Sequence, residues 1–290
     1  MGKKTGKAVA GFDESIFDDL GLNKEKEGAF HYLYPRVTIV IPTYNCDQAI
    51  GVTLDSVINQ SYPELEIIVV DASSTDHTLS IIKSYRERIS RIYSVTTYQQ
   101  YEMLNRGISL STGTYICFLF PGDFYISKDT IIHMMQLALD NDTPDLVYCG
   151  ALLRYRSDEP LILSRPFTME YLKKGMQPTT LQSCCFLVDS LVSLRKFDPS
   201  YSLRGGFDLL CRFRLRGDLK ACVTSRVLTD FDRREMNHKL IVAHFTETLQ
   251  VLYEHFGFMT MFFWLFRQQD IKRMIRLWFR GLRSAFFGRN

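Results

Sequence analysis

The chain has 290 residues, of which 46% are hydrophobic, and a formal net charge of +3 at pH 7. A chain of this length can bury a full core, either as one large α/β domain with an appendage or as two small domains. The charge is too small to indicate a nucleic-acid partner, and no basic run is interleaved with aromatic residues in a recognised motif.

Residues 1–35 are mixed in charge, contain several glycines and show no sustained hydrophobic period. This pattern predicts a loosely held arm with at most one short helix, near residues 15–20. Lys3 and Lys4 are not followed by the apolar segment of a signal peptide, and the longest apolar runs are shorter than the ~20 residues that a membrane span needs. We therefore expect a cytoplasmic protein without a spanning helix.

From Arg36 onward, the sequence alternates between strand and helix patterns. The β-branched run 37–41 ends at Pro42 and predicts a buried strand. Apolar residues then recur at helical spacing over 50–58, and a second strand is expected over 65–70. Strands that alternate with helices indicate a parallel sheet with right-handed crossovers.

The next elements continue this alternation. Ser73 or Ser74 is expected to cap the helix that follows the second strand. A short strand near 91–95 and a helix bearing Tyr101 lead to the apolar and aromatic run 115–120. That run is too short to span a membrane and is typical of a strand buried on both faces.

The run 115–120 ends at a Pro-Gly turn, and Asp123 follows the turn. Because parallel strands present their carboxyl ends at one edge of the sheet, Tyr44, Asp71 and Asp123 can converge there, where open α/β sheets bind ligands. Asp123 could instead be a turn residue that caps the next helix, although Asp129 is better placed for that role. We favour the functional interpretation.

These segments resemble the family 2 glycosyltransferases, whose nucleotide-sugar-binding fold is called GT-A, from about Val37 to about Asn237. Neither the G-x-G-x-x-G nor the P-loop motif is present, which argues against a dinucleotide oxidoreductase and a P-loop enzyme. The segments that carry the resemblance are Pro42-Thr-Tyr-Asn45, Val70-Asp-Ala-Ser-Ser-Thr-Asp76, Tyr101-Glu-Met-Leu-Asn-Arg-Gly107, Ser111-Thr-Gly-Thr-Tyr115, Phe118-Leu-Phe-Pro-Gly-Asp123 and Phe207-Asp-Leu-Leu-Cys-Arg212.

The resemblance implies an inverting, hexosyltransferase-type enzyme that moves a sugar from a nucleotide-diphosphate donor to an acceptor hydroxyl. The resemblance favours a UDP-sugar as the donor. The Tyr101–Gly107 segment is most similar to the bacterial branch that assembles lipopolysaccharide, capsule and other envelope glycans. A lipid-linked or envelope glycan is therefore the expected acceptor.

The resemblance also implies roles for individual residues. Asp123 would bind Mg²⁺ or Mn²⁺ together with the diphosphate, because a cation neutralises the charge on this leaving group. Tyr44 would lie against the base, and Asp71 near the base or ribose; the alternative for Tyr44 is a half-buried turn aromatic. The expected donor-binding residues are Pro42, Thr43, Tyr44, Asn45, Asp71, Asn105 and Arg106, although a solvated helix face would also explain Arg106.

The general base is less well defined by the sequence. Residues 155–180 are irregular and form the expected acceptor-side region, followed by a strand over 181–188 and a helix that begins at Gly205-Gly206. Gly206 occupies the usual acidic position of the family, which leaves Asp208 as the nearest carboxylate and the expected general base. The alternative is that Asp208 is a helix-start carboxylate paired with Arg212, four residues later. Both interpretations stay open.

Other positions also depart from the family pattern. They are Ala72 at the site of a second Asp, Gly122 at the first carboxylate of the metal motif, Leu181 at a common His, and Arg234-Glu235 at a common Gly pair. With Gly206, they leave a second hypothesis open. This is a catalytically weakened relative that acts as a membrane-associated binding or scaffold protein.

The cysteines and the later histidines predict no metal site. Seven cysteines include the pair Cys184 and Cys185 but no C-x-x-C motif, which indicates neither zinc nor a disulfide framework. We expect reduced thiols. His244 and His255 have no metal partner at ligand spacing and are interpreted as ordinary helix residues.

The end of the chain has the pattern of an amphipathic helix lying on an anionic membrane. The alternative is a helix packed on its own domain. We expect an arm over 1–35, a GT-A domain over 36–237 and a helical, membrane-surface extension over 238–290, peripheral on the inner face of the cytoplasmic membrane. The apolar side of the last helix would carry Ile271, Met274, Ile275, Trp278, Phe279 and Leu282, and the basic side Lys272, Arg273, Arg276, Arg280 and Arg283.

Overall fold

The computed structural model describes residues 34–155, 159–232 and 238–267. The expected helix near 15–20, the expected basic helix after residue 267, and Arg234 and Glu235 lie outside these residues. The elements below therefore belong to the described part of the chain.

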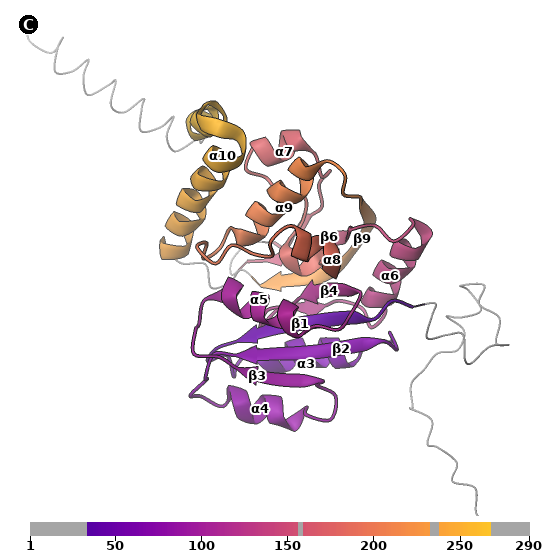
Figure 1. Ribbon diagram of the computed structural model, residues 1–290. Helices are drawn as coiled ribbons and strands as arrows, with labels where there is room; N and C mark the ends of the chain where they lie inside the picture. The colour runs from indigo at the N-terminus through magenta and orange to yellow at the C-terminus, as the bar shows by residue number, and fades with distance from the viewer. Residues whose placement is uncertain (1–33, 156–158, 233–237, 268–290) are drawn as a thin grey trace, which may run out of the picture.

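Helices and strands alternate through the first half of the structure (Figure 1). The strands are β1 (Val37–Thr43), β2 (Leu65–Asp71), β3 (Arg91–Ser94), β4 (Tyr115–Phe118), β5 (Phe124–Tyr125), β6 (Leu146–Arg154), β7 (Leu161–Leu163), β8 (Cys184–Leu187) and β9 (Ala221–Asp232). The helices are α3 (Ile50–Ile58), α4 (Thr78–Ser84), α5 (Gln100–Leu110), α6 (Thr130–Asp140), α7 (Met169–Lys173), the 3-10 turn η1 (Leu181–Ser183), α8 (Val188–Ser193), α9 (Gly205–Arg216) and α10 (His238–Arg267).

One sheet connects these strands in the order β3-β2-β1-β4-β8-β6-β9-β5, with β7 beside β6. The half formed by β3, β2, β1 and β4 is parallel, whereas β8 is antiparallel to both β4 and β6. The expected α/β fold with a sheet flanked by helices is confirmed, and the sheet, expected to be mostly parallel, is mixed. The parallel half brings the carboxyl ends of four strands to a common edge, and β1 lies at its centre, paired with both β2 and β4. In the other half, β6 and β9 are also parallel to each other.

Alternate residues of the central strands supply the two faces of the core. In β4, Tyr115 and Cys117 pack with α3 and α6, whereas Ile116 and Phe118 pack with α5, α8 and α9. All four side chains are fully buried. This explains the uninterrupted apolar sequence, because a strand covered by helices on both faces has no side for polar residues.

Two local expectations are wrong. Helix α4 begins at Thr78 and has His77 at its N-cap, with no side-chain cap, so neither Ser73 nor Ser74 caps it. Ser74 instead donates its hydroxyl to Asp71 Oδ1 at 2.6 Å. The expected strand over 181–188 is shorter, because the turn η1 occupies its first residues before β8 begins at Cys184.

Helix α10 bends sharply at Gly257, whose backbone has φ 79° and ψ 171°. A positive φ of this kind is accessible to glycine without steric cost. Val251 and Leu252, before the bend, are fully buried, and Val251 joins the core face formed by α5 and α9. The first part of α10 is thus packed into the domain rather than appended to it. Among the described helices, none is long and apolar enough to cross a membrane.

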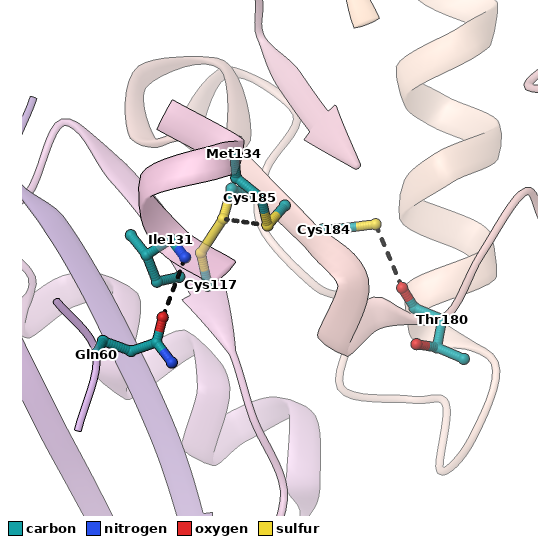
Figure 2. Close-up of a disulfide and its surroundings, with 7 residues drawn as sticks. All are labelled: Gln60, Cys117, Ile131, Met134, Thr180, Cys184 and Cys185. Carbon is teal, nitrogen blue, oxygen red and sulfur yellow. Dashed lines mark hydrogen bonds between the residues drawn. A yellow bond between two sulfur atoms is a disulfide. The ribbon is translucent and has the colours of Figure 1, made fainter. Parts of the chain in front are cut away.

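A disulfide links Cys117 of β4 to Cys185 of β8 (Figure 2). The expectation of reduced thiols is wrong for this pair. Cys117 and Cys185 are direct partners in the antiparallel register of β4 and β8, with their Cα atoms 4.6 Å apart, a separation that a disulfide can bridge. The adjacent Cys184 points to the opposite face, where its thiol contacts the carbonyl of Thr180.

We predict that alkylation in denaturant without reductant modifies five thiols, those of Cys46, Cys149, Cys184, Cys211 and Cys222. Reduction before alkylation should raise the number to all seven. In Cys117→Ser, the five and the freed Cys185 should react without reductant. Intact mass after labelling measures each number, and modification of all seven in the unreduced protein would contradict the disulfide.

Candidate active site

A pocket of about 300 Å³ lies at the carboxyl edge of the parallel half of the sheet. It is lined by residues from distant segments, which include Tyr101 of α5, Asp123 after β4, Gln182 of η1, Gly206 of α9 and Asp232 of β9. The wall between α5 and α9 is fixed by hydrogen bonds, because the Tyr101 hydroxyl donates to the Leu203 carbonyl at 2.8 Å and accepts from the Gly206 N–H at 3.1 Å. This volume is at the lower end of the range for small-molecule sites.

Asp123 is the buried acid of this pocket, and its residue is only 2% exposed. Its Oδ2 accepts a hydrogen bond from Gln182 Nε2 at 2.6 Å, and its Oδ1 accepts one from the Asp232 N–H at 2.9 Å. The turn before it depends on Gly122, whose φ of +94° favours glycine. Thr53 of α3 donates to the Asp123 carbonyl at 2.8 Å and so ties this turn to the first helix.

The electrostatic environment of Asp123 opposes its ionisation. Burial, together with the negative charges of Asp230 and Asp232, raises the pKa of Asp123 to about 7 against the lowering effect of its hydrogen bonds. Arg154, at the end of β6, offsets part of this charge. Its Nε lies 2.5 Å from Asp230 Oδ1, and one Nη lies 3.8 Å from Asp232 Oδ2.

Asp71 lies at the same edge of the sheet but is hydrogen-bonded on both oxygens. Thr43 donates to Oδ1 at 2.9 Å, and the Ser74 N–H donates to Oδ2 at 2.8 Å. Asp71 is fully buried, and Pro42 is buried in β1. Asp71 and Thr43 therefore hold the loop after β2 against β1. The side chain of Asn45 joins this arrangement by accepting from the Thr75 N–H at 2.9 Å.

Tyr44 follows β1 and is half exposed, at 50%. Its ring stacks on that of Tyr98, with centroids 5.9 Å apart and planes 25° apart, and Tyr98 is 74% exposed. Two exposed aromatic rings beside a sheet edge can bind a planar ring of a ligand. The sequence interpretation missed Tyr98, because it lies in a polar loop with no motif around it.

Two expected donor-binding residues are engaged elsewhere. Asn105 donates its amide to the Phe197 carbonyl at 2.8 Å and accepts from the Phe197 N–H at 3.0 Å, which fixes the loop before α9. Arg106 lies over the Tyr93 ring at 4.2 Å and donates to its hydroxyl. Neither side chain lines the pocket. This geometry favours the alternative of a surface position for Arg106 and a positioning role for Asn105.

Asp208 does not line the pocket either. It is 3% exposed, and Arg212 donates to its Oδ2 through Nε and one Nη at 2.9 and 2.7 Å. His255 of α10 lies 2.7 Å from its Oδ1. Burial opposes ionisation, but the hydrogen bonds from His255 and Arg212 hold the pKa of Asp208 below its usual value. The structure therefore favours the ion-pair alternative over the role of general base.

Gly206 does line the pocket, and packing does not require a glycine there. A Cβ at this position would meet Leu181 Cβ at 3.6 Å, which is ordinary van der Waals contact. In contrast, a Cβ at Gly205 would lie 2.7 Å from the Tyr101 ring, so that position does require glycine. A Cβ at residue 206 would thus meet no steric obstacle, and this chain has no carboxylate there.

The pocket could hold a cation only with help from a ligand. No group of three or more His, Cys, Asp or Glu side chains in the described residues is arranged to bind a metal. Asp123 offers a buried, uncompensated carboxylate, and each of its oxygens keeps a lone pair beyond the hydrogen bond it accepts. Mg²⁺ and Mn²⁺ suit a site in which one or two carboxylates are completed by phosphate and water. The donor set fits such a cation.

Sequence comparison matches the family described as Glycosyl transferase family 2 to residues 38–197, more than half of the chain. A PGL/p-HBAD biosynthesis glycosyltransferase of Mycobacterium bovis (strain BCG / Pasteur 1173P2) is 32% identical over 41% of this chain and 48% of its own length. An uncharacterised glycosyltransferase of Rickettsia typhi is 30% identical over 62% of this chain and 58% of its own length. The chain therefore spans about half the length of these relatives.

The fold is also similar to those of solved glycosyltransferases. S. aureus TarS, in complex with UDP-GlcNAc, superposes with a TM-score of 0.59 at 17% identity, over 76% of this chain and 71% of that chain. The mannosyltransferase PcManGT from Pyrobaculum calidifontis, in complex with GDP-Man and Mn²⁺, gives 0.57 at 18% identity, over 86% and 81%. At these identities the similarity shows the fold alone.

We predict that Asp123→Asn stabilises the metal-free protein increasingly as the pH rises from 5 to 8. The folded wild type keeps the Asp123 proton up to a pKa of about 7, whereas the unfolded chain releases it near the usual value of about 4. The wild type therefore loses stability as the pH rises through 7. The difference in free energy of unfolding should grow by roughly 2 to 4 kcal/mol.

Urea unfolding in the presence of chelator measures this difference at each pH. Asp189→Asn, which changes an exposed carboxylate on α8, is the matched control. A difference for Asp123→Asn that varies with pH no more than that of the control would contradict the assignment of a buried, protonated acid.

Proposed function

The chain belongs to glycosyl transferase family 2, and from this we propose that it transfers a sugar from a nucleotide-diphosphate donor to an acceptor hydroxyl. The observation that carries the proposal is the position of Asp123. Its buried carboxylate lies in a pocket at the carboxyl edge of the parallel strands, the edge at which α/β sheets bind ligands. The exposed pair of Tyr44 and Tyr98 lies at the ends of strands of the same half.

In this proposal, the base of the donor binds at Tyr44 and Tyr98, which can stack against it at little entropic cost. Thr43, Asn45 and Asp71 act by holding the adjoining loop in place through the hydrogen bonds described above. A UDP-sugar is the donor we favour, and the TarS structures with UDP-GlcNAc and with UDP support a nucleotide-sugar donor on this fold.

We assign to Asp123 the binding of a divalent cation, Mn²⁺ or Mg²⁺, together with the diphosphate of the donor. Such a cation neutralises the charge that develops on the leaving diphosphate. Gln182 and the Asp232 N–H hold the Asp123 carboxylate in one orientation. The PcManGT complex with GDP-Man and Mn²⁺ supports the use of a divalent cation on this fold.

An inverting transfer needs a proton acceptor for the attacking hydroxyl, on the face of the sugar opposite the leaving group. Asp208 is the base that the sequence suggested, but both its oxygens are bound outside the pocket. Asp232 lines the pocket together with Gly206, and Arg154 lies near its carboxylate. We therefore propose Asp232 as the proton acceptor and Asp208 as a residue that joins α9 to α10.

For the acceptor, we propose a lipid-linked or envelope glycan at the inner face of the cytoplasmic membrane. The basic, amphipathic sequence after Arg267 supports an anionic membrane as a partner, because it combines aromatic residues with a nearly uniform positive charge. The mycobacterial relative is named for PGL/p-HBAD biosynthesis, and that name belongs to that protein.

A second candidate function follows from Gly206. Because the pocket lacks the usual acidic residue and Asp208 is engaged elsewhere, the chain could bind a nucleotide sugar and membrane as a scaffold without turnover. The two functions differ in one observable. The scaffold binds a nucleotide diphosphate but transfers no sugar from any donor to any acceptor.

We predict that UDP binding requires both a divalent cation and Asp123. Asp123→Ala should remove the metal-dependent part of the affinity, since a carboxylate is needed to hold the cation beside the diphosphate. Isothermal calorimetry with Mn²⁺ or with chelator measures this for wild type, Asp123→Ala and the control Asp189→Ala. Equal UDP binding by all three proteins under both conditions would contradict the assignment of Asp123 as a metal ligand.

We further predict that Asp232→Asn and Asp208→Asn have different effects. Asp232→Asn should lower kcat by roughly a hundredfold or more, with little change in donor affinity, because a general base acts in the transition state. Asp208→Asn should instead lower the free energy of unfolding by roughly 2 kcal/mol, since it weakens buried contacts to Arg212 and His255. Its kcat should stay within about threefold of wild type.

Steady-state transfer assays and urea unfolding on the same preparations measure these effects. If Asp208→Asn abolishes turnover while the protein remains fully stable, the assignment is reversed. If the wild type transfers no sugar although it binds UDP, the scaffold function is favoured.

A further inference from the structure

A second cleft, of about 640 Å³, lies between α7 and the part of α10 after its bend. Its walls include Lys173 at the end of α7, Lys174 and Met176 after it, and Phe263 and Arg267 of α10. None of its lining residues lines the pocket that contains Asp123. In size, it suits a ligand with a polar head and an apolar part.

The polar side of this cleft is positively charged. Three cations, Lys173, Lys174 and Arg267, line it together with one carboxylate, Glu170. Lys174 lies 2.5 Å from Glu170, and this hydrogen bond, followed by the charges of Lys174 and Arg267, lowers the pKa of Glu170. The carboxylate is thus ionised and compensated by one lysine, and the cleft retains an excess of positive charge.

The floor of the cleft is built by close packing between α7 and α10. The Trp264 indole N–H donates to the Lys174 carbonyl at 3.0 Å, and the Trp264 ring lies 5.3 Å from the ring of Phe245. Gly175 has a φ of +71°, and a Cβ there would lie 2.6 Å from Trp264 Nε1. This separation is shorter than the van der Waals contact that two such atoms need. Glycine at this position lets the two segments approach, so the cleft does not depend on surface side chains alone.

An exposed apolar surface borders the cleft on α10. We call it the α10 aromatic patch, and it consists of Phe258, Met259, Phe262, Phe263 and Phe266, which are 56, 59, 37, 59 and 40% exposed. The rings of Phe258, Phe262 and Phe266 contact one another in succession, with centroids 5.8 and 4.4 Å apart. A contiguous apolar patch of this kind on a protein surface indicates a binding surface.

We infer that this cleft binds the phosphate head of an anionic phospholipid while the α10 aromatic patch enters the bilayer interface. The inference rests on the membrane location proposed above, which it deepens by naming a site. Apolar side chains beside a cationic cleft match the two parts of a lipid, hydrocarbon and phosphate. Lys173 and Arg267 bind the phosphate, and Phe258 and Phe262 bury apolar area among the acyl chains.

The charge of the chain argues against two other occupants. Residues 268–290 carry Lys272, Arg273, Arg276, Arg280, Arg283 and Arg289 but a single acid, Asp270, so this segment repels the cleft rather than neutralising it. A second copy of the chain, packed patch to patch, would bring two cationic clefts together. An anionic bilayer is attracted by the cleft and by the following basic sequence alike.

The experiment is vesicle flotation of the full chain, with vesicles of phosphatidylcholine alone or mixed with phosphatidylglycerol. The cleft variant is Lys173→Gln with Arg267→Gln. Its control, Lys83→Gln with Arg86→Gln, removes the same charge from exposed positions on and beside α4, at the opposite end of the molecule from α7 (Figure 1). Phe258→Ser with Phe262→Ser tests the patch, and Leu161→Ser with Ile162→Ser, at exposed positions of β7, is its control.

We expect the wild type to bind vesicles that contain phosphatidylglycerol and not phosphatidylcholine alone. The cleft variant should bind roughly thirtyfold more weakly, because each basic residue near the surface contributes about fivefold, whereas its control should change binding by less than about threefold. The patch variant should lose binding, and its control should not.

Equal weakening by the cleft variant and its charge control overturns the site and leaves a general attraction to acidic lipid. Wild-type binding to neither vesicle, or a concentration-dependent dimer that the patch variant disrupts, overturns the inference and the proposed membrane location. UDP binding, measured on every variant, reports folding and tests the proposed function separately. Vesicle binding in the expected order without UDP binding would keep this inference and contradict the proposed UDP-sugar donor.

Discussion

The hydrogen bonds to the buried carboxylate of Asp123 join the two halves of the sheet. Its two hydrogen bonds come from Gln182 and Asp232, which are 59 and 109 residues away. Desolvating a carboxylate is costly, so both partners must be in place for the acid to be tolerated. The parallel half, which carries Asp123, thus depends on η1 and β9 of the other half to complete its pocket.

The parallel half could be predicted from the sequence because each of its strands is marked by a local pattern of apolar residues. Apolar runs such as 115–120 and 65–70 predict buried strands, and parallel strands share an edge, so Asp71 and Asp123 fall at one side of the sheet. The i,i+4 spacing of Asp208 and Arg212 likewise predicts their ion pair as one of two alternatives. Family resemblance added a nucleotide-sugar function that no periodicity could provide.

The features that could not be predicted from the sequence depend on contacts between distant segments. The approach of His255 to Asp208 and of Asp232 to Asp123 follows from how α10 and β9 return to the sheet, which no local pattern specifies. The pairing of Cys117 with Cys185 needs the register of two antiparallel strands. The sequence Asp230-Phe231-Asp232, in which two acids flank one apolar residue where β9 ends, is the signal that could have indicated additional acids at the pocket.

The disulfide lies at the junction of the two halves, because β4 belongs to the parallel half and β8 is antiparallel to both of its neighbours. The 68 residues of separation between its cysteines include β5, α6, β6, β7 and α7. A protease that cuts one peptide bond in this loop after Asp123 would leave two fragments that stay covalently joined. One fragment would carry Asp123 and the other Asp232, so a nicked molecule retains both acids in one covalent unit.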